Sequence, residues 1–350
     1  MLKQELELLG SQLFEIAKKH SVPAGGALAV DRDAFSAEVQ AALDSHPNVE
    51  LVRGEVQSVE DACKECDACI IATGPLTRDD FAQSISTLVG EEQLTFYDAV
   101  APIVMADSLD MDTLFYQGRY DKNAEIDSQG DYLNAPFTKE EYENFIEELL
   151  AADKVIAKDF ETKELFQACQ PIEEIARKGK DAPRFGPLKP VGLTDPRTGK
   201  RPWAALQLRA ENREKTCFNL VGFQTNLTFP EQERIFRMIP GLQNAEFARL
   251  GVMHRNTFID APQLLNPDLS LRAEATKNFS KTIPIFFAGQ ISGTEGYVEA
   301  IRSGLHAGIS CLTKLQGKTL ESPSTKTAFG SLLAYATNPE TENYQPMHVN

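Results

Sequence analysis

Several signals of common protein classes are missing from this sequence. No apolar run approaches the roughly 18–20 residues that a membrane-spanning helix needs. Residues 2–17 instead mix Leu and Ile with Lys and Glu at helical spacing, which is typical of an amphipathic helix and not of a secretion signal. The dinucleotide-binding fingerprint Gly-x-Gly-x-x-Gly is also absent. We therefore expect a cytoplasmic protein with no membrane partner.

Basic residues are scarce relative to acidic ones. The chain has 35 Lys and Arg against 51 Asp and Glu, a formal charge of −16. This balance argues against nucleic-acid binding by the whole surface, because affinity for phosphates depends on clustered cations. Residues 177–215 differ, with eleven basic and four acidic residues and a local balance of +7. This segment is either an anion-binding face or a solvated, turn-rich surface.

The cysteines do not suggest a disulfide framework. There are six, without a secretion signal, which favours reduced thiols. Three of them form Cys63-x-x-Cys66-x-x-Cys69, a spacing that hints at a metal or iron–sulfur site. A fourth ligand at a matching distance is missing, and Cys69 opens the apolar run CIIA. We therefore predict no metal site and place Cys69 in a buried strand.

Alternating helix and strand patterns predict an α/β or α+β architecture. Helices are expected over residues 2–17, 31–46, 139–152 and from 296 to about 315. Strands are expected over residues 49–59, 69–73, 203–209, 217–225, 247–258 and 283–288, and loops over 182–202. Residues 94–104 form a further apolar run.

Two glycine-containing turns follow predicted buried strands. One is residues 71–74 (IATG), and the other is residues 287–296 (FAGQISGTEG), which leads into a helix. Glycine allows close approach of a ligand to the backbone, and a helix amino terminus offers free N–H groups to phosphate. Such turns also occur without ligands, but two in one chain suggest a dinucleotide held at the carboxyl ends of a parallel sheet.

The motifs of the chain resemble those of the TrmFO family, the methylenetetrahydrofolate- and FAD-dependent tRNA (uracil-5-)-methyltransferases, which are related to the GidA flavoproteins. The resemblance runs in order along nearly the whole chain. It rests on residues 22–32 (VPAGGALAVDR), 72–77 (ATGPLT), 96–104 (FYDAVAPIV), 185–193 (FGPLKPVGL), 221–225 (VGFQT), 251–258 (GVMHRNTF) and 287–299 (FAGQISGTEGYVE).

The resemblance implies an α/β fold: a FAD-binding Rossmann-like domain of the glutathione-reductase type, formed by residues 1–105 and 246–350, with a smaller inserted α+β domain at 106–245 for the substrate. It implies methylation of the T-loop uridine of tRNA to 5-methyluridine. FAD, NADH or NADPH as reductant and 5,10-methylenetetrahydrofolate as co-substrate are implied with it. Two alternatives stay open: a ribosomal RNA uracil-5-methyltransferase of the same family, and a non-catalytic flavoprotein remnant that binds RNA.

The resemblance also implies roles for individual residues. Cys169, in residues 166–173 (FQACQPIE), matches the nucleophile that adds to uracil C6, although Ala168 stands where the family usually has glycine. Arg177 and Lys178 follow closely enough to lower its pKa if the chain folds back. His254 and Arg255 are candidates for the folate or flavin, and Lys200 and Arg201 for RNA phosphates. The flavin contacts are expected at Thr73, Gly74, Gly289, Gln290, Gly293, Thr294, Gly296 and Tyr297.

Two departures from the family stand at the ends of the sequence. The family's amino-terminal strand, its glycine-rich fingerprint and a second functional cysteine have no counterpart here, and family members continue beyond residue 350. We therefore expect the 350 residues by themselves to lack the first βαβ unit, to bind FAD weakly or not at all, and to show no methyltransferase activity.

Overall fold

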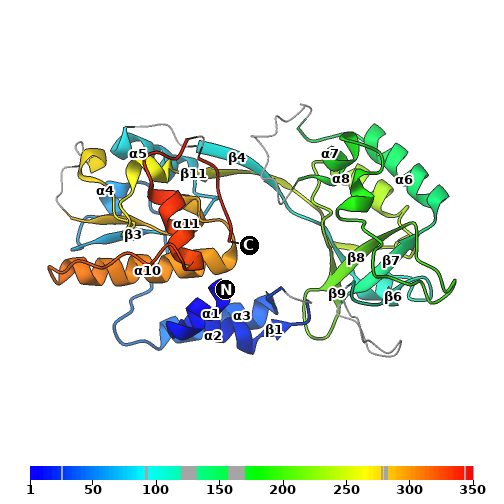
Figure 1. Cartoon of the computed structure of the whole chain (residues 1–350), viewed down its shortest axis with the longest axis horizontal. Coiled ribbons are helices and arrows are strands. Elements are labelled where there is room, and N and C mark those ends of the chain that lie inside the picture. The colour runs from blue at the N-terminus through cyan, green and yellow to red at the C-terminus, as the bar shows by residue number, and fades with distance from the viewer. Residues whose placement is uncertain are drawn as a thin grey trace. The chain divides into compact units, whose positions relative to one another are not determined.

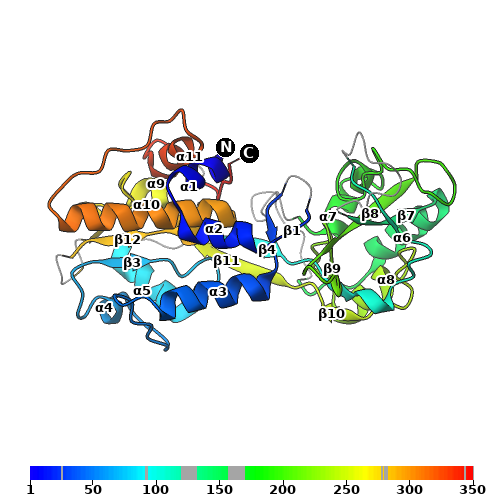
Figure 2. The same cartoon turned by 90° about the horizontal axis from the view of Figure 1, so that it is seen from below.

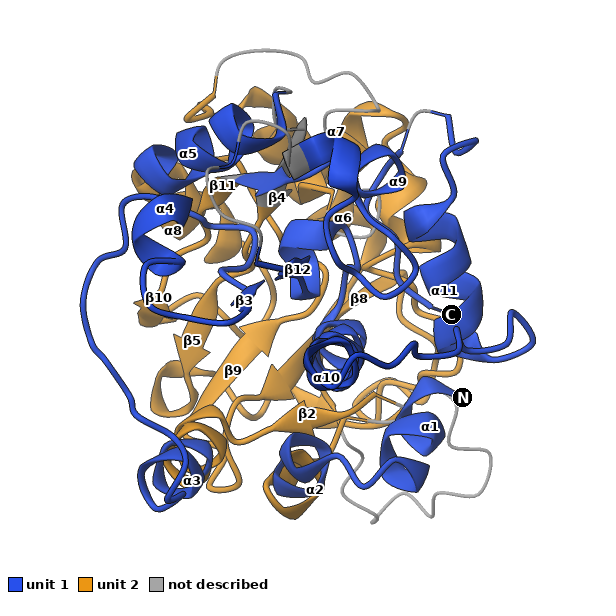
Figure 3. Cartoon of the chain, turned by 90° about the vertical axis from the view of Figure 1, so that its left-hand side faces the viewer, with its two compact units in different colours: residues 1–16, 39–96, 255–350 blue, residues 17–38, 97–254 orange. Residues whose placement is uncertain are grey.

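The computed structural model describes residues 1–24, 27–90, 94–119, 132–156, 170–276, 279, 283–342 and 344–349. The chain divides into two compact units (Figure 3). Unit 1 comprises residues 1–16, 39–96 and 255–350, and unit 2 comprises residues 17–38 and 97–254. Strands β4 (Leu94–Ala99) and β11 (Met253–Phe258) pair with each other, and the chain passes from one unit to the other within them.

Unit 2 is built on a six-stranded antiparallel sheet in the order β10-β5-β9-β8-β7-β6 (Figure 1). The central strands β7 and β8 are buried on both faces, since nearly every residue in them is inaccessible. The strands are β5 (Ile103–Met105), β6 (Phe115–Tyr116), β7 (Leu133–Phe137), β8 (Ala204–Ala210), β9 (Cys217–Leu220) and β10 (Phe247–Arg249).

Helix α6 (Lys139–Ala151) packs on this sheet and on α7 (Ile172–Arg177) and α8 (Phe229–Phe236). It begins with a capping box, in which Thr138 and Glu141 each satisfy a free backbone N–H. Its buried face joins a run of aromatic rings in which Phe145 contacts both Phe137 and Phe223, with centroids 5.5 and 6.0 Å away. Short 3-10 turns η1 (Ala106–Ser108) and η4 (Ala182–Phe185) complete the unit.

Residues 17–38 belong to unit 2, whereas the sequence-based division placed them in the FAD-binding domain. Strands β1 (Ser21–Val22) and β2 (Ala29–Val30) form a hairpin between α2 (Gln12–Lys19) and α3 (Arg32–Asp44). Tyr132 Oη donates to the carbonyl of Ala24 over 2.9 Å, and Arg213 donates to that of Lys19. These bonds give the hairpin its place in unit 2.

Unit 1 contains a short parallel pair of strands, β3 (Cys69–Ile71) and β12 (Ile285–Phe287). Helix α10 (Tyr297–Leu315) contacts both strands and runs alongside them (Figure 2). The other elements are α1 (Leu2–Leu8), α4 (Val59–Ala62), α5 (Asp79–Val89), α9 (Ala261–Leu264), α11 (Ala328–Thr337), η5 (Ala273–Thr276) and η6 (Gly289–Ser292). In the described part of the chain, no helix is both long and apolar enough to cross a membrane.

Several predicted elements differ from the structure; the strand predicted over residues 247–258, for example, is two strands, β10 and β11. The first helix is interrupted: α1 ends at Leu8, and Gly10 takes a left-handed φ of +65° before α2 begins. The strands predicted over residues 49–59 are wrong, since this stretch forms none and Val52 is 79% exposed. An isolated strand has no stability of its own, and no described strand pairs with this segment.

Candidate functional site

The two predicted glycine turns lie next to each other in unit 1. Strands β3 and β12 pair in parallel register, with Phe287 opposite Ile71, and Ala288 N–H donates to Ile71 O over 3.0 Å. Parallel strands end at the same edge of a sheet, so residues 72–74 and 288–290 leave that edge together. Gly74 and Gly289 both adopt φ of +75°, a conformation that favours glycine. This edge is where ligands bind in parallel sheets.

The turn after β12 is held by the hydroxyl groups of Thr294, within the turn, and Ser303, on α10. Gly289 N–H donates to Ser303 Oγ over 2.9 Å, and Thr294 Oγ1 donates to Gly289 O over 2.9 Å. Thr294 is fully buried, so its hydroxyl supports the loop from inside and is not available to a ligand. Gln290 Nε2 donates to Glu295 Oε1 over 2.5 Å. Thr294 and Ser303 therefore fix the path of the backbone around Gly289.

At two glycines of the second turn a neighbouring side chain leaves no room for a Cβ, whereas Gly74 of the first turn has open space around it. A side chain at Gly293 would clash with the ring of Tyr344, whose hydroxyl donates to Ser292 O over 2.7 Å. A side chain at Gly296 would clash with Glu299. By contrast, a Cβ added at Gly74 meets no described atom within 4 Å. Open space at a glycine of positive φ is the arrangement that admits close approach of a ligand, so Gly74 fits a cofactor contact best.

Helix α10 begins at this turn, with Gly296 as its N-cap residue. Its first N–H groups have no acceptor within the helix and carry the positive end of the helix dipole. Glu299 lies in this first turn, and its carboxylate accepts from Val349 N–H over 3.0 Å. Tyr297 is almost fully exposed. The helix start can therefore receive an anion, although one carboxylate already lies there.

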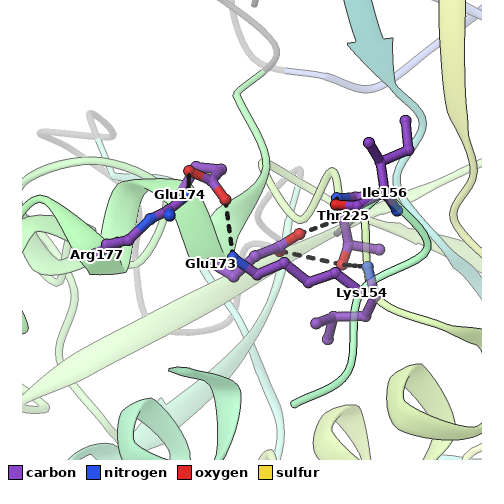
Figure 4. Close-up of polar contacts among 8 residues, drawn as sticks. Lys154, Ile156, Glu173, Glu174, Arg177 and Thr225 are labelled. Carbon is purple, nitrogen blue, oxygen red and sulfur yellow. Dashed lines mark hydrogen bonds and ion pairs between the residues drawn. The ribbon is translucent and has the colours of Figure 1, made fainter. Parts of the chain in front are cut away.

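A buried carboxyl group in unit 2 was not assigned a role from the sequence. Glu173 is 1% exposed, and its carboxylate accepts from Asn226 N–H over 2.6 Å and from Thr225 Oγ1 over 3.1 Å. Its neighbour Glu174 instead pairs with Lys154, 3.1 Å away, and with Arg177 (Figure 4). Burial raises the pKa of Glu173 to about 7, against the hydrogen bonds that favour its ionised form.

Asn226 forms hydrogen bonds with residues on both sides of segment 157–169. Its side chain accepts from Ile156 N–H over 3.1 Å and donates to Ile156 O over 2.9 Å, while its backbone N–H donates to Glu173. Ile172 N–H donates to Gln224 O over 2.8 Å. The described residues before and after 157–169 are therefore bound to the same short stretch, 224–227.

The predicted nucleophile Cys169 lies outside the described residues. The residue after it, Gln170, accepts from Lys178 Nζ over 2.7 Å. Arg177 pairs with Glu174. The two cations expected near Cys169 thus lie on the last turn of α7 and just beyond it, with Lys178 bonded to the cysteine's neighbour in sequence.

The basic segment 177–215 is only partly engaged in ion pairs. Arg184 pairs with Asp181 and Arg197 with Asp195, at 3.2 and 2.9 Å. Lys200 and Arg201 are exposed, and within the described residues neither forms an ion pair. The bridge between Asp195 and Lys200 and the left-handed Gly199 hold them on a tight turn. These two cations are free to meet an anionic partner.

Two further predicted residues, His254 and Arg255, belong to β11, whose Thr257 N–H donates over 2.9 Å to the carbonyl of Pro75, the residue after Gly74. His254 is half-buried in β11, and Arg255 follows it in the same strand, with its side chain outside the description. The unit boundary falls between them.

Burial raises the pKa of the Cys69 thiol, which hydrogen-bonds with Cys63. Among the side chains that the structure describes, no group of three His, Cys, Asp or Glu is arranged to hold a metal ion.

The chain is similar to known proteins along its whole length. Residues 1–319 match the family model "Glucose inhibited division protein A" (GIDA). The methylenetetrahydrofolate--tRNA-(uracil-5-)-methyltransferase TrmFO of Geobacter sulfurreducens is 51% identical over 350 residues, which cover 100% of this chain and 77% of that protein. The TrmFO proteins of Pelobacter propionicus and Desulfotalea psychrophila are 52% and 47% identical, again over 100% of this chain and over 74% and 76% of theirs.

Solved structures agree on the fold. Aquifex aeolicus GidA, in its form I crystal, superimposes with a TM-score of 0.70 at 15% identity, and the match covers 96% of this chain. The chain spans 61% of that GidA chain and about three quarters of the curated relatives above. The α/β fold class predicted from the sequence is confirmed by this match. With identity near 50% over its full length, the chain belongs to the TrmFO family of folate-dependent tRNA (uracil-5-)-methyltransferases, within the broader GIDA family.

Proposed function

We propose that the protein containing these 350 residues methylates carbon 5 of a tRNA uridine, the T-loop uridine, with methylenetetrahydrofolate as the one-carbon donor. The observation that carries the proposal is identity of about 50%, over every residue of the chain, with relatives named for this reaction. The exposed cations Lys200 and Arg201 supply a place for RNA phosphates, as the reaction requires.

We also propose that FAD binds at the edge where β3 and β12 end. The open, left-handed Gly74 and the adjoining turn at Gly289 fit a large planar cofactor that approaches the backbone closely. Thr73, Gln290, Gly293, Gly296 and Tyr297 complete the proposed contacts, while Thr294 holds the turn in shape. Bound flavin would supply redox and one-carbon carrier chemistry, with NADH or NADPH as the reductant.

In the proposed reaction Cys169 acts as the nucleophile. Carbon 5 of uracil reacts poorly until C6 carries an electron-rich substituent. The thiolate of Cys169 adds to C6, and the electron pair of the C5–C6 double bond becomes available at C5 to form the new bond to the donor carbon. The bond between the donor carbon and its carrier nitrogen breaks, and loss of the C5 proton expels the thiolate and restores the double bond. Because the donor carbon is at the oxidation level of formaldehyde, two electrons are also needed to bring it to methyl, and NADH or NADPH would supply them by way of the flavin. Lys178 donates to Gln170, the residue that follows Cys169 in sequence, and a cation that reached the thiol would lower its pKa.

Replacing Lys200 and Arg201 together with alanine should weaken RNA binding and reduce its salt dependence. Each lost phosphate contact lowers the slope of log affinity against log salt by about 0.7–0.9, so two contacts remove about 1.4–1.8. The measurement is the dissociation constant for tRNA between about 50 and 200 mM salt. A matched control replaces Lys318 and Lys326, two exposed lysines of unit 1. If affinity and slope match the control, segment 177–215 is only a solvated surface.

The substrate assay separates the proposal from its alternative. The protein, as its gene encodes it, is incubated with FAD, NADPH and methylenetetrahydrofolate, and with either an unmodified tRNA transcript or a ribosomal RNA fragment. Nucleoside mass spectrometry should find 5-methyluridine in the tRNA only. Methylation of the ribosomal fragment instead would support the rRNA enzyme, and methylation of neither would support a non-catalytic flavoprotein.

A further inference from the structure

Residues 181–190 of unit 2 form a turn that is fixed at many points. Within it, Gly186 N–H and Leu188 N–H both donate to Pro183 O, over 3.1 and 2.8 Å. Pro183 and Leu188 are buried. Pro187 packs so closely on Gly222 that a Cβ there would lie 2.8 Å from it. The backbone of this turn therefore has one well-defined course.

Phe185 lies in the middle of this fixed turn, yet its ring is not packed. It is 81% exposed, the highest exposure of any phenylalanine in the described part of the chain. The turn buries the apolar side chains on either side of it and presents this one to solvent. An exposed phenylalanine on mobile backbone would be unremarkable, but here the fixed backbone holds the Cα of Phe185 in place, so binding through its ring does not require the ordering of a loop.

Three cations belong to this turn, directly precede it or contact Trp203, to which the turn is bonded. The preceding residue, Arg184, donates from Nε to Trp203 O over 3.0 Å, and its guanidinium lies over the Trp203 ring at 3.6 Å. Lys139 lies over the same ring at 5.4 Å. Lys180 is exposed and, in the residues described, forms no ion pair. The stacking of Arg184 on Trp203 holds the residue before Phe185 in place. Arg184 also pairs with Asp181, 3.2 Å away, so Lys180, directly before the turn, supplies the unpaired positive charge here.

We propose that Phe185 is an RNA contact on which an unpaired nucleobase stacks, with Arg184 and Lys180 beside the adjoining phosphates. This inference rests on the proposed function, since it assumes an RNA substrate. Aromatic rings within positively charged surfaces are the usual means of holding single-stranded bases. A small ligand such as folate fits less well, because four-fifths of the ring is open to solvent and pockets for small molecules enclose their ligands.

The test compares Phe185→Ala, Phe185→Trp and the unchanged protein for binding to an unmodified tRNA. Loss of one stacked base should weaken binding about 5- to 150-fold, while Phe185→Trp retains wild-type affinity. The salt slope should stay constant in both variants, since no charge is removed. Phe229→Ala, at a half-exposed phenylalanine on α8, should bind as wild type does. Thermal unfolding of each variant checks that the fold is intact.

Three outcomes would overturn the inference, and they are distinguishable. Wild-type affinity in Phe185→Ala would show that the ring does not touch RNA, while leaving the proposed function standing. A rise in the KM for the folate donor alone, with unchanged tRNA affinity, would assign the ring to the small-molecule site. Failure of the unchanged protein to bind tRNA would remove the proposed function together with the inference.

Discussion

Replacing Cys169 with alanine should abolish the reaction and also the covalent bond to RNA. The variant is expected to lose methylation by on the order of a thousandfold or more, since without a thiolate at C6 nothing makes uracil C5 nucleophilic. An RNA that carries 5-fluorouridine at the target position traps the normal enzyme, because the fluorine at C5 cannot leave as a proton does. Denaturing electrophoresis should show this adduct for the wild type and none for Cys169→Ala.

The control for this experiment is Cys217→Ala in β9, a partly buried cysteine of the same unit. It should form the adduct and methylate RNA as the wild type does. Tryptic mass spectrometry of the trapped wild type should place the RNA on the peptide containing Cys169. An adduct of undiminished yield in Cys169→Ala would show that another group attacks C6 and that the assignment is wrong.

Replacing Glu173 with glutamine should change how stability depends on pH. The pKa of Glu173 is about 7 in the folded chain because of burial, against an ordinary value of 4.5. The folded state therefore keeps a proton that the unfolded chain releases. Between about pH 4.5 and 7 the wild type loses stability as the pH rises, by about 3 kcal/mol in total. Glutamine has no proton to release, so Glu173→Gln should not show this loss.

Glutamine also suits the hydrogen bonds at this position. Its carbonyl can accept from Asn226 N–H, and its amide can donate to Thr225 Oγ1, which now donates to Glu173. Chemical unfolding of wild type and variant at pH 5 and pH 8 measures the effect. The variant should be the more stable protein at pH 8, with a much smaller advantage at pH 5. Equal differences at the two pH values would mean that Glu173 is ionised in the folded chain at both.

Local signals predicted part of the fold correctly. The helix at residues 139–152 is present as α6, because its apolar spacing and its capping residues Thr138 and Glu141 are all within one short segment. The meeting of residues 72–74 with 288–290 was predicted from two strand–turn patterns, since parallel strands bring such turns to one edge. Both inferences needed only the order of elements along the chain.

Other features depend on contacts that no local pattern contains. Residues 49–59 carry Val and Leu at intervals, as strands do, but they pair with no described strand. Nothing in the sequence around Glu173 distinguishes it from the other acidic residues. Its hydrogen-bond partners, Thr225 and Asn226, are more than fifty residues away. Thr294 was expected to contact flavin, yet its hydroxyl is used inside the turn. Gly293 must be glycine because a side chain there would clash with Tyr344, a residue about fifty positions away that belongs to no motif with it.

The origin of the methyl carbon tests the central claim most directly. The protein, as its gene encodes it, is supplied with FAD, NADPH, unmodified tRNA and methylenetetrahydrofolate labelled with carbon-13 in its one-carbon unit. We predict 5-methyluridine at the T-loop position with the label in its methyl group, dependent on both FAD and the folate. Unlabelled 5-methyluridine, or label that appears without FAD, would contradict the account. So would a protein that binds flavin and tRNA and leaves the uridine unmodified.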